Sequence, residues 1–208
     1  VVALLEGSDP SLRNETIVIG AHRDHFGTQA GLLFAGADDN ASGTAVVLEV
    51  ARALVTSAVA PKRSLLFVSF SGEEQGLLGS RLYMARPARP LKHTMAMINI
   101  DHAGIGNGRL TVGVTGLDEA GVRQAAASAG LVDQLDVYGF FPGGDHVPFK
   151  EADIPTVTIV SGGAHPHFHQ ATDTLETIRP QVLLTTARYV LALAIRLANE
   201  TDPTTSAR

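Results

Sequence analysis

The sequence predicts an α/β sandwich with a largely parallel central sheet. Short, β-branched apolar runs alternate along the chain with longer segments whose apolar residues recur at helical spacing. In addition, acidic or histidine residues occur at or shortly after the ends of four of the apolar runs. Ligands bind at that place in open parallel sheets, beyond the carboxyl ends of the strands.

Each short apolar run is predicted to be a strand, because four to eight apolar, β-branched residues between turn signals are typical of buried strands. The predicted strands span residues 1–5, 16–21, 64–70, 94–100 and 155–160. Helical spacing predicts helices over residues 42–58, 117–130 and 180–199. The last is the longest, and Pro180 suits its first turn.

The length of 208 residues fits one domain, which we expect to span residues 1–200. Residues 201–208 are polar and are expected to form a flexible tail. The chain starts with Val1 and shows no signal peptide, so we expect a processed protein or an excised domain.

Composition argues against several classes of partner. The formal charge of −5, the 5% aromatic content and the lack of a basic run argue against a nucleic-acid partner. The absence of cysteine excludes disulfides, thiolate metal ligands and a cysteine nucleophile. The most apolar stretch, 187–198, contains two arginines and is too short to cross a bilayer, so we expect no membrane partner.

The histidines predict a metal site. Six of the eight lie in segments that follow predicted strands, and only His93 and His146 lie elsewhere. Without cysteine, a metal site must use nitrogen and oxygen ligands. Imidazole with carboxylate suits zinc, and manganese or cobalt are plausible substitutes.

Paired acidic residues supply the matching carboxylates. Asp38 and Asp39 precede a predicted helix, where capping explains one acidic residue and the second is free to bridge two metal ions. Glu73 and Glu74 follow a predicted strand, so one can bind metal while the other faces a water molecule as general base. The residues alone leave open which glutamate has which role.

Other carboxylates are placed to orient ligands. Asp24 lies two residues after His22 and is suited to orient its ring, and Asp173 has a similar place four residues after His169. No G-x-S-x-G nucleophile motif occurs.

The chain resembles the catalytic domain of the M28 zinc peptidases, the co-catalytic two-zinc aminopeptidases. The resemblance rests on six segments, which occur in the family's order: GAHRDH (20–25), AGADDNASG (35–43), SFSGEEQGLLGS (69–80), NID (99–101), GDHVPF (144–149) and HPHFHQATDT (165–174). It implies a three-layer αβα sandwich with a mixed, largely parallel sheet.

The resemblance also implies a role for each matching residue. His22 and Asp101 would hold one Zn²⁺, Glu74 and His169 would hold the other, and Asp39 would bridge the two. Glu73 would be the general base, and Asp24 would orient His22. The residues expected to contact substrate are His102, Asp145, His146, His165 and Phe168.

Three departures from the family pattern bear on substrate contact. Phe168 stands where many members have a tyrosine whose hydroxyl can stabilise an oxyanion, and His165, His167 or His146 could take over that function. His102 stands where methionine is common. Gly143 and Gly144 stand where some members carry Arg-Ser, so an arginine able to bind a substrate carboxylate is absent.

The resemblance therefore implies a secreted or periplasmic zinc aminopeptidase that acts on peptides, with N-terminal or inserted domains missing from this chain. The alternatives are a dipeptidase or carboxypeptidase of the same fold, a glutaminyl-cyclase-like acyltransferase with one zinc, and a binding domain with a decayed site. A decayed site would be expected to have lost a ligand or Glu73, and none is lost here.

Overall fold

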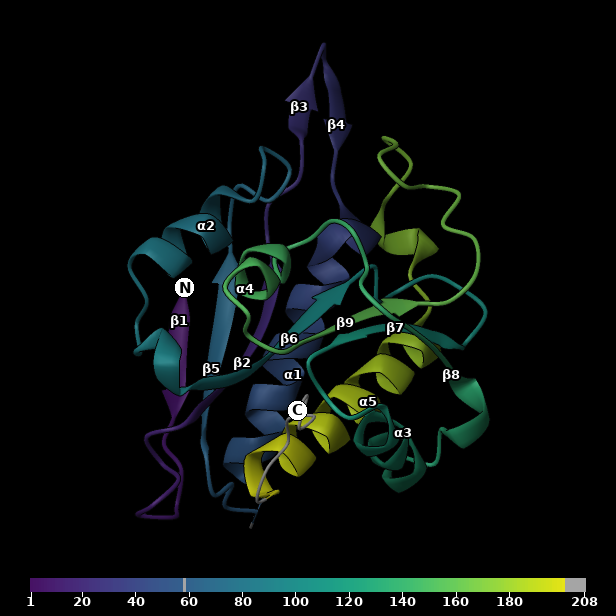
Figure 1. Ribbon diagram of the computed structural model, residues 1–208. Coiled ribbons are helices and arrows are strands. Elements are labelled where there is room, and N and C mark those ends of the chain that lie inside the picture. Colours follow the sequence, from purple (N-terminus) through teal and green to yellow (C-terminus); the bar gives the residue numbers. More distant parts are fainter. Residues whose placement is uncertain (58, 201–208) are drawn as a thin grey trace.

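The computed structural model describes residues 1–57 and 59–200. Within these residues, seven strands form one sheet (Figure 1). From one edge to the other the strands are β1 (Val2–Leu5), β5 (Ser64–Phe70), β2 (Thr16–His22), β6 (Thr94–Asp101), β9 (Thr156–Ser161), β7 (Leu110–Thr115) and β8 (Leu135–Tyr138). The five strands predicted from the sequence are all present. The tail predicted at residues 201–208 lies outside the described residues.

The centre of the sheet is parallel. β2 pairs in parallel with β5 and β6, and β6 pairs in parallel with β9. Antiparallel pairing occurs at β1 with β5 and at β7 with β9. The register sets His22 beside Phe70 and Asp101 beside Val160. The carboxyl ends of four strands therefore meet at one edge of the sheet, as the sequence predicts.

Helices cover both faces of the sheet (Figure 1). One face carries α1 (Gly43–Thr56), α3 (Glu119–Ser128) and α5 (Pro180–Asn199), which are the three helices predicted from the sequence. The other face carries α2 (Leu78–Ala85) and α4 (Val147–Glu151), which the sequence pattern did not predict. The three-layer sandwich is thus confirmed.

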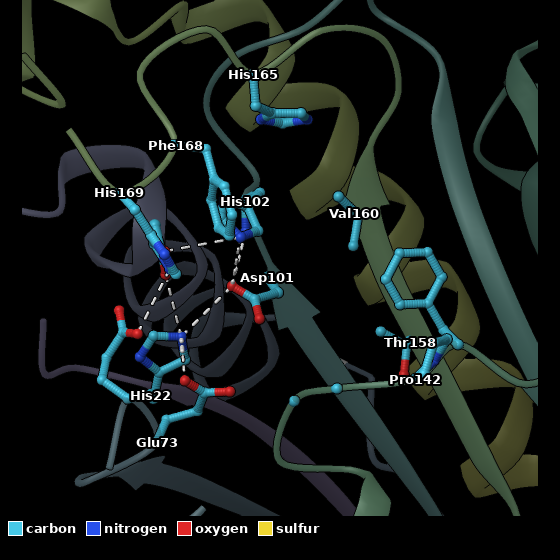
Figure 2. Close-up of a pocket in the computed structure, with 15 residues that line it drawn as sticks. His22, Glu73, Asp101, His102, Pro142, Thr158, Val160, His165, Phe168 and His169 are labelled. Atoms are coloured by element: carbon cyan, nitrogen blue, oxygen red, sulfur yellow. Dashed lines mark hydrogen bonds and ion pairs between the residues drawn. The ribbon is translucent and has the colours of Figure 1, made fainter. Parts of the chain in front are cut away.

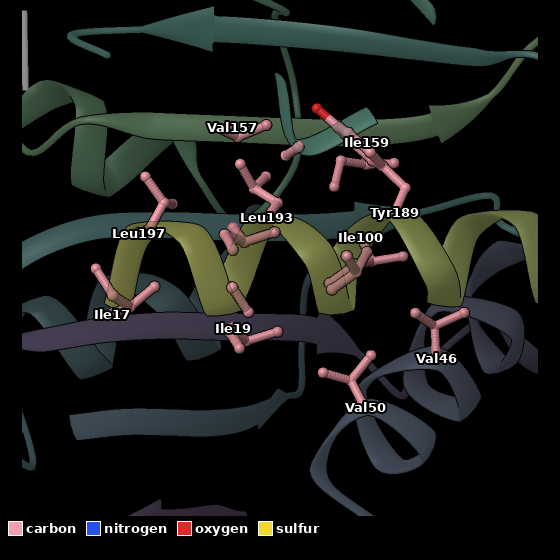
Figure 3. Packing of buried hydrophobic residues seen from close by; sticks show 14 of the residues in the cluster. Ile17, Ile19, Val46, Val50, Ile100, Val157, Ile159, Tyr189, Leu193 and Leu197 are labelled. Carbon is pink, nitrogen blue, oxygen red and sulfur yellow. The ribbon is translucent and has the colours of Figure 1, made fainter. Parts of the chain in front are cut away.

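Each face of the sheet buries its own core. In the larger core, Leu193 and Leu197 of α5 pack near Ile17 and Ile19 of β2 (Figure 3), and all four are at most 3% exposed. The smaller core joins the sheet to α2 and α4, with these residues among its members: Val18, Met97, Tyr83 and Phe149. β2 is buried along its whole length because it faces both cores.

By length and composition, α5 is long and apolar enough to cross a membrane, and it is the one helix among the described residues of which this is true. The apolar stretch 187–198, which the sequence analysis judged too short to cross a bilayer, is shorter than α5, which extends over 20 residues. Eight of them are buried, and Tyr189, Val190 and Leu193 belong to the larger core. This burial is typical of a core helix.

The sequence analysis also missed a hairpin and several short elements. β3 (Gly27–Gln29) and β4 (Leu32–Phe34) form a two-stranded hairpin that projects from the sandwich (Figure 1). β7 and β8 were not predicted either. The remaining elements are short helical turns at Ala37–Ser42, Leu91–His93, Val132–Gln134 and Leu175–Thr177.

Candidate metal centre

The polar residues at the strand ends converge on one cavity of about 450 Å³ (Figure 2). His22 ends β2, Asp101 ends β6, and Glu73 and Glu74 follow β5. Asp39 reaches the same place from the helical turn that precedes α1. The fold therefore brings together five side chains from four separate segments.

The turn Ala37–Ser42 places the buried carboxylates of Asp38 and Asp39 in different surroundings. The Oδ1 of Asn40 accepts a hydrogen bond from the N–H of Gly43, the first residue of α1. Both Asp38 and Asp39 are thereby left for other contacts. Gly36 precedes the turn at φ 67°, and a Cβ there would lie 2.5 Å from the ring of His25. Glycine at this position lets His25 pack under the turn.

Asp39 lies between two groups of potential ligands. Its Oδ1 is 3.4 Å from His22 Nε2, which is 3.5 Å from Asp101 Oδ1. Its Oδ2 is 3.2 Å from His169 Nε2. On that second side, His169 Nε2 is 3.6 Å from Glu74 Oε2.

These separations suit metal ions. Two ligand atoms at ~2.1 Å from one tetrahedral zinc lie about 3.4 Å apart. The four distances fall around that value, and the donor set on each side is one imidazole with carboxylates, which suits zinc. The residues present therefore fit a pair of zinc ions with one oxygen of Asp39 directed to each.

Several carboxylates lie close together in the buried site, and this shifts the pKa values of its residues. Burial, together with Asp101 and Asp145, raises the pKa of Glu73 to about 7. Burial, together with Asp39 and Glu73, raises the pKa of Glu74 to about 8. Although burial disfavours its charge, His22 has a pKa raised to about 12 by Asp101 and Asp39. Metal ions would replace these protons as the compensating positive charge.

Asp24 lies beside His22, as the sequence predicts. The ring Nδ1 of His22 is 3.1 Å from the main-chain oxygen of Asp24 and 3.8 Å from its carboxylate. The main-chain carbonyl is the hydrogen-bond partner. It fixes the tautomer that leaves Nε2 free to bind metal.

His25 is a site residue that the sequence analysis did not select. Its Nδ1 lies 2.5 Å from Glu74 Oε1 and 3.8 Å from Asp39 Oδ2, and its side chain is 4% exposed. The contact with Glu74 is shorter than the separation of two ligands on one zinc ion. Its position three residues after His22 is the signal that could have identified it.

Asp38, adjacent to Asp39, was also not selected as a site residue. Its Oδ1 accepts hydrogen bonds from the N–H groups of Gly104 and Ile105, at 2.7 and 3.0 Å. Its Oδ2 is 2.8 Å from the Nδ1 of His165. Although burial opposes it, interactions with His102, His165 and the N–H of Gly104 hold the pKa of Asp38 well below its usual range.

Asp173 does not orient His169. Its carboxylate accepts hydrogen bonds from the main-chain N–H groups of Asp38 and Asp39, at 2.8 and 3.0 Å. Asp173 is 0% exposed. It therefore stabilises the turn that carries Asp39, and the four-residue spacing from His169 was misleading.

The residues expected to contact substrate divide into two groups. His102, His165 and Phe168 line the cavity, together with Thr158 and an apolar wall formed by Phe141, Pro142 and Val160. Figure 2 shows Pro142, Thr158 and Val160 on the side of the cavity opposite His22 and Glu73. Asp145 and His146 do not line it and are at most 1% exposed. Both side chains are thus enclosed by protein, and substrate contact by these two residues stays a prediction.

Two aromatic rings hold His169. The ring of Phe168 stacks on it at a centroid distance of 3.7 Å, and Phe26 contacts it edge-on at 4.8 Å. His102 lies nearby, with Nε2 3.7 Å from Asp101 Oδ1 and 3.9 Å from Asp39 Oδ2. It thus faces the space between the two groups of ligands.

Known protein sequences resemble this chain over most of its length. The profile of Peptidase family M28 matches residues 1–194. The leucine aminopeptidase 1 of Ajellomyces dermatitidis is 31% identical over 91% of this chain and 54% of its own length.

Solved structures agree with the sequence comparison. The aminopeptidase from Aneurinibacillus sp. strain AM-1 superposes with a TM-score of 0.81 at 26% identity, over 100% of this chain and 50% of that one. The zinc aminopeptidase BSAP from Bacillus subtilis gives 0.79 at 27% identity, over 99% and 52%. The chain thus spans about half the length of the relatives it matches.

Proposed function

Because the chain belongs to peptidase family M28, we propose that it is the catalytic domain of a two-zinc aminopeptidase. The observation that carries the proposal is the placement of Asp39, with one oxygen 3.4 Å from His22 and the other 3.2 Å from His169. A one-zinc enzyme needs no carboxylate directed to two ligand groups. The spacing thus favours a two-zinc hydrolase over a cyclase.

In this proposal each zinc ion has its own residues. His22 and Asp101 hold one ion, Glu74 and His169 hold the other, and Asp39 binds both. When bound, zinc increases the acidity of a water molecule and polarises the carbonyl of the scissile peptide. Manganese or cobalt, which accept the same donors, are expected to substitute.

Glu73 is the proposed general base. Its Oε2 lies 4.0 Å from His22 Nε2, and its side chain is 16% exposed at the cavity wall. The carboxylate accepts the proton of the attacking water and returns it to the nitrogen of the leaving amine. A base of this kind works best with a pKa near the working pH.

The substrate is proposed to be a peptide with a free N-terminus. The apolar wall of Phe141, Pro142 and Val160 supplies a surface for its first side chain, and the acidic cluster attracts the terminal ammonium group. Relatives named leucine aminopeptidases support this reading. A relative from Bacteroides thetaiotaomicron is named a leucine aminopeptidase precursor, which supports an exported protein.

The first test combines metal content with substrate class. We expect about two zinc ions per chain and hydrolysis of aminoacyl anilides with a free amine, with no hydrolysis after N-acetylation. Cleavage of N-blocked peptides from the C-terminus would indicate a carboxypeptidase. Release of pyroglutamyl peptide without a free amino acid, at one zinc per chain, would indicate a cyclase.

Glu73→Gln tests the assignment of the base. The amide is nearly isosteric but cannot accept the proton, so the variant should keep both metal ions and lose turnover by ~10²-fold or more. Near-normal turnover with full metal content would refute the assignment. Asp133→Asn, at an exposed site, is the matched control and should retain wild-type turnover.

A further inference from the structure

His169 comes from a segment with little regular structure. Between β9 and α5 the chain forms only one short helical turn, Leu175–Thr177, among the described residues. The side chain of His169 is 40% exposed, and its backbone has a φ of 56°. Neither a strand nor a helix fixes this residue. Holding its ring 3.2 Å from Asp39 therefore requires other contacts, because ordering an irregular segment costs conformational entropy.

His165 supplies one such contact through both nitrogens of its ring. Nε2 is 2.8 Å from the main-chain oxygen of Ser161, the last residue of β9. Nδ1 is 2.8 Å from Oδ2 of Asp38. Because a carbonyl oxygen only accepts, Nε2 donates to Ser161, and Nδ1 faces a carboxylate that accepts two N–H groups on its other oxygen.

The far end of the segment is fixed to the same turn. Asp173 accepts hydrogen bonds from the main-chain N–H groups of Asp38 and Asp39. Residues 165–173 are thus fixed at both ends to the turn that carries Asp39, and His169 lies between the two attachment points. The partners are separated by 127 and 135 residues in the chain.

We propose that His165 is a positioning residue that holds His169 in place for the second metal ion. The proposal rests on the two-zinc function above. His165 lines the cavity, but both of its ring nitrogens already have partners, so it has none to offer a substrate or an oxyanion. This role replaces the expectation that His165 contacts substrate.

His165→Phe is the decisive variant. It keeps a flat ring for the edge-on contact with His102, at 5.3 Å between centroids, and removes both donors. Metal-free protein is titrated with Zn²⁺ in a calorimeter, and His169→Ala identifies which binding step belongs to the second ion. We expect that step to weaken by about 10–100-fold in His165→Phe, with the first step unchanged within about threefold.

Two further variants separate positioning from general stability. His167→Phe is the matched control, because the half-buried His167 makes its hydrogen bond to the hydroxyl of Thr172, at 2.9 Å, and not to the turn that carries Asp39. It should leave both steps unchanged. His165→Asn keeps an amide donor near the position of Nδ1 and should weaken the second step by less than His165→Phe does, about 3–10-fold.

The outcomes are distinguishable. If wild-type protein binds fewer than two zinc ions, the proposed function itself fails. If it binds two and His165→Phe keeps the wild-type affinity for the second, only the positioning role is overturned. Equal weakening of both steps also overturns it, because that is the result of general destabilisation. Should His165→Phe not fold, unchanged second-ion affinity in His165→Asn overturns the positioning role in the same way.

Discussion

Replacing Asp173 with asparagine should destabilise the protein without changing the shape of any side chain. The carboxylate is 0% exposed and accepts two hydrogen bonds, from the N–H groups of Asp38 and Asp39. Both of these residues are at most 3% exposed. Asparagine has one acceptor oxygen, so one N–H loses its partner and faces an amide NH₂ group instead.

The cost follows from the two hydrogen bonds. Each bond to a charged acceptor contributes about 1.5–3 kcal/mol, and a neutral amide replaces one of them with a bond of about 1 kcal/mol. The expected loss in the free energy of unfolding is therefore about 3 kcal/mol. In a domain of this size, a loss of 1 kcal/mol lowers Tm by about 2–4 °C, so Tm should fall by about 6–12 °C.

Urea denaturation of the metal-free protein measures this loss directly, because bound zinc would otherwise add its own stabilisation. Asp133→Asn is the control, since this aspartate is exposed, and its effect should stay within about 0.5 kcal/mol. If Asp173→Asn matches that control, the two hydrogen bonds do not hold the turn, and the reasoning is wrong.

Two further predictions concern charge and packing. The raised pKa values of Glu73, about 7, and Glu74, about 8, mean that the folded metal-free protein binds more protons than the unfolded chain above pH ~4.5, so its stability should fall as pH rises towards 8. The Tm gap between zinc-loaded and chelator-treated protein should widen over the same range, and a constant gap in thermal scans from pH 5 to 8 would contradict this linkage. In the core, Leu193→Ala should cost about 2–5 kcal/mol because Leu193 is 0% exposed, whereas Leu184→Ala on the same helix, 50% exposed, should cost less than 1 kcal/mol; equal values in urea denaturation would contradict the packing of α5.

Much of the fold could be predicted from local pattern. β2, β5, β6 and β9 appear as short apolar runs because they are buried on both faces, and α1 and α5 show clear helical spacing. β8, with four residues, and α4, with five, are too short to show a period. The β3–β4 hairpin is mostly exposed, so no buried face marks it in the sequence.

The candidate site was predictable to a similar degree. His22, Glu73 and Asp101 stand at or shortly after the ends of predicted strands, and they do lie together. Asp145 and His146 were expected to contact substrate at the same site, but both are buried and neither lines the cavity. Adjacency in sequence shows where a side chain enters the fold, and only packing decides which way it faces.

By itself, the sequence determined the layered α/β architecture and the inventory of ligand types, because apolar periodicity and the lack of cysteine are properties of the chain alone. Only the tertiary structure decided which partners meet. His165 reaches Asp38 across 127 residues and Asp173 reaches the same turn across 135, while His25 takes a place beside Glu74. Such contacts depend on how distant strands are aligned in the sheet, and no local pattern records that alignment.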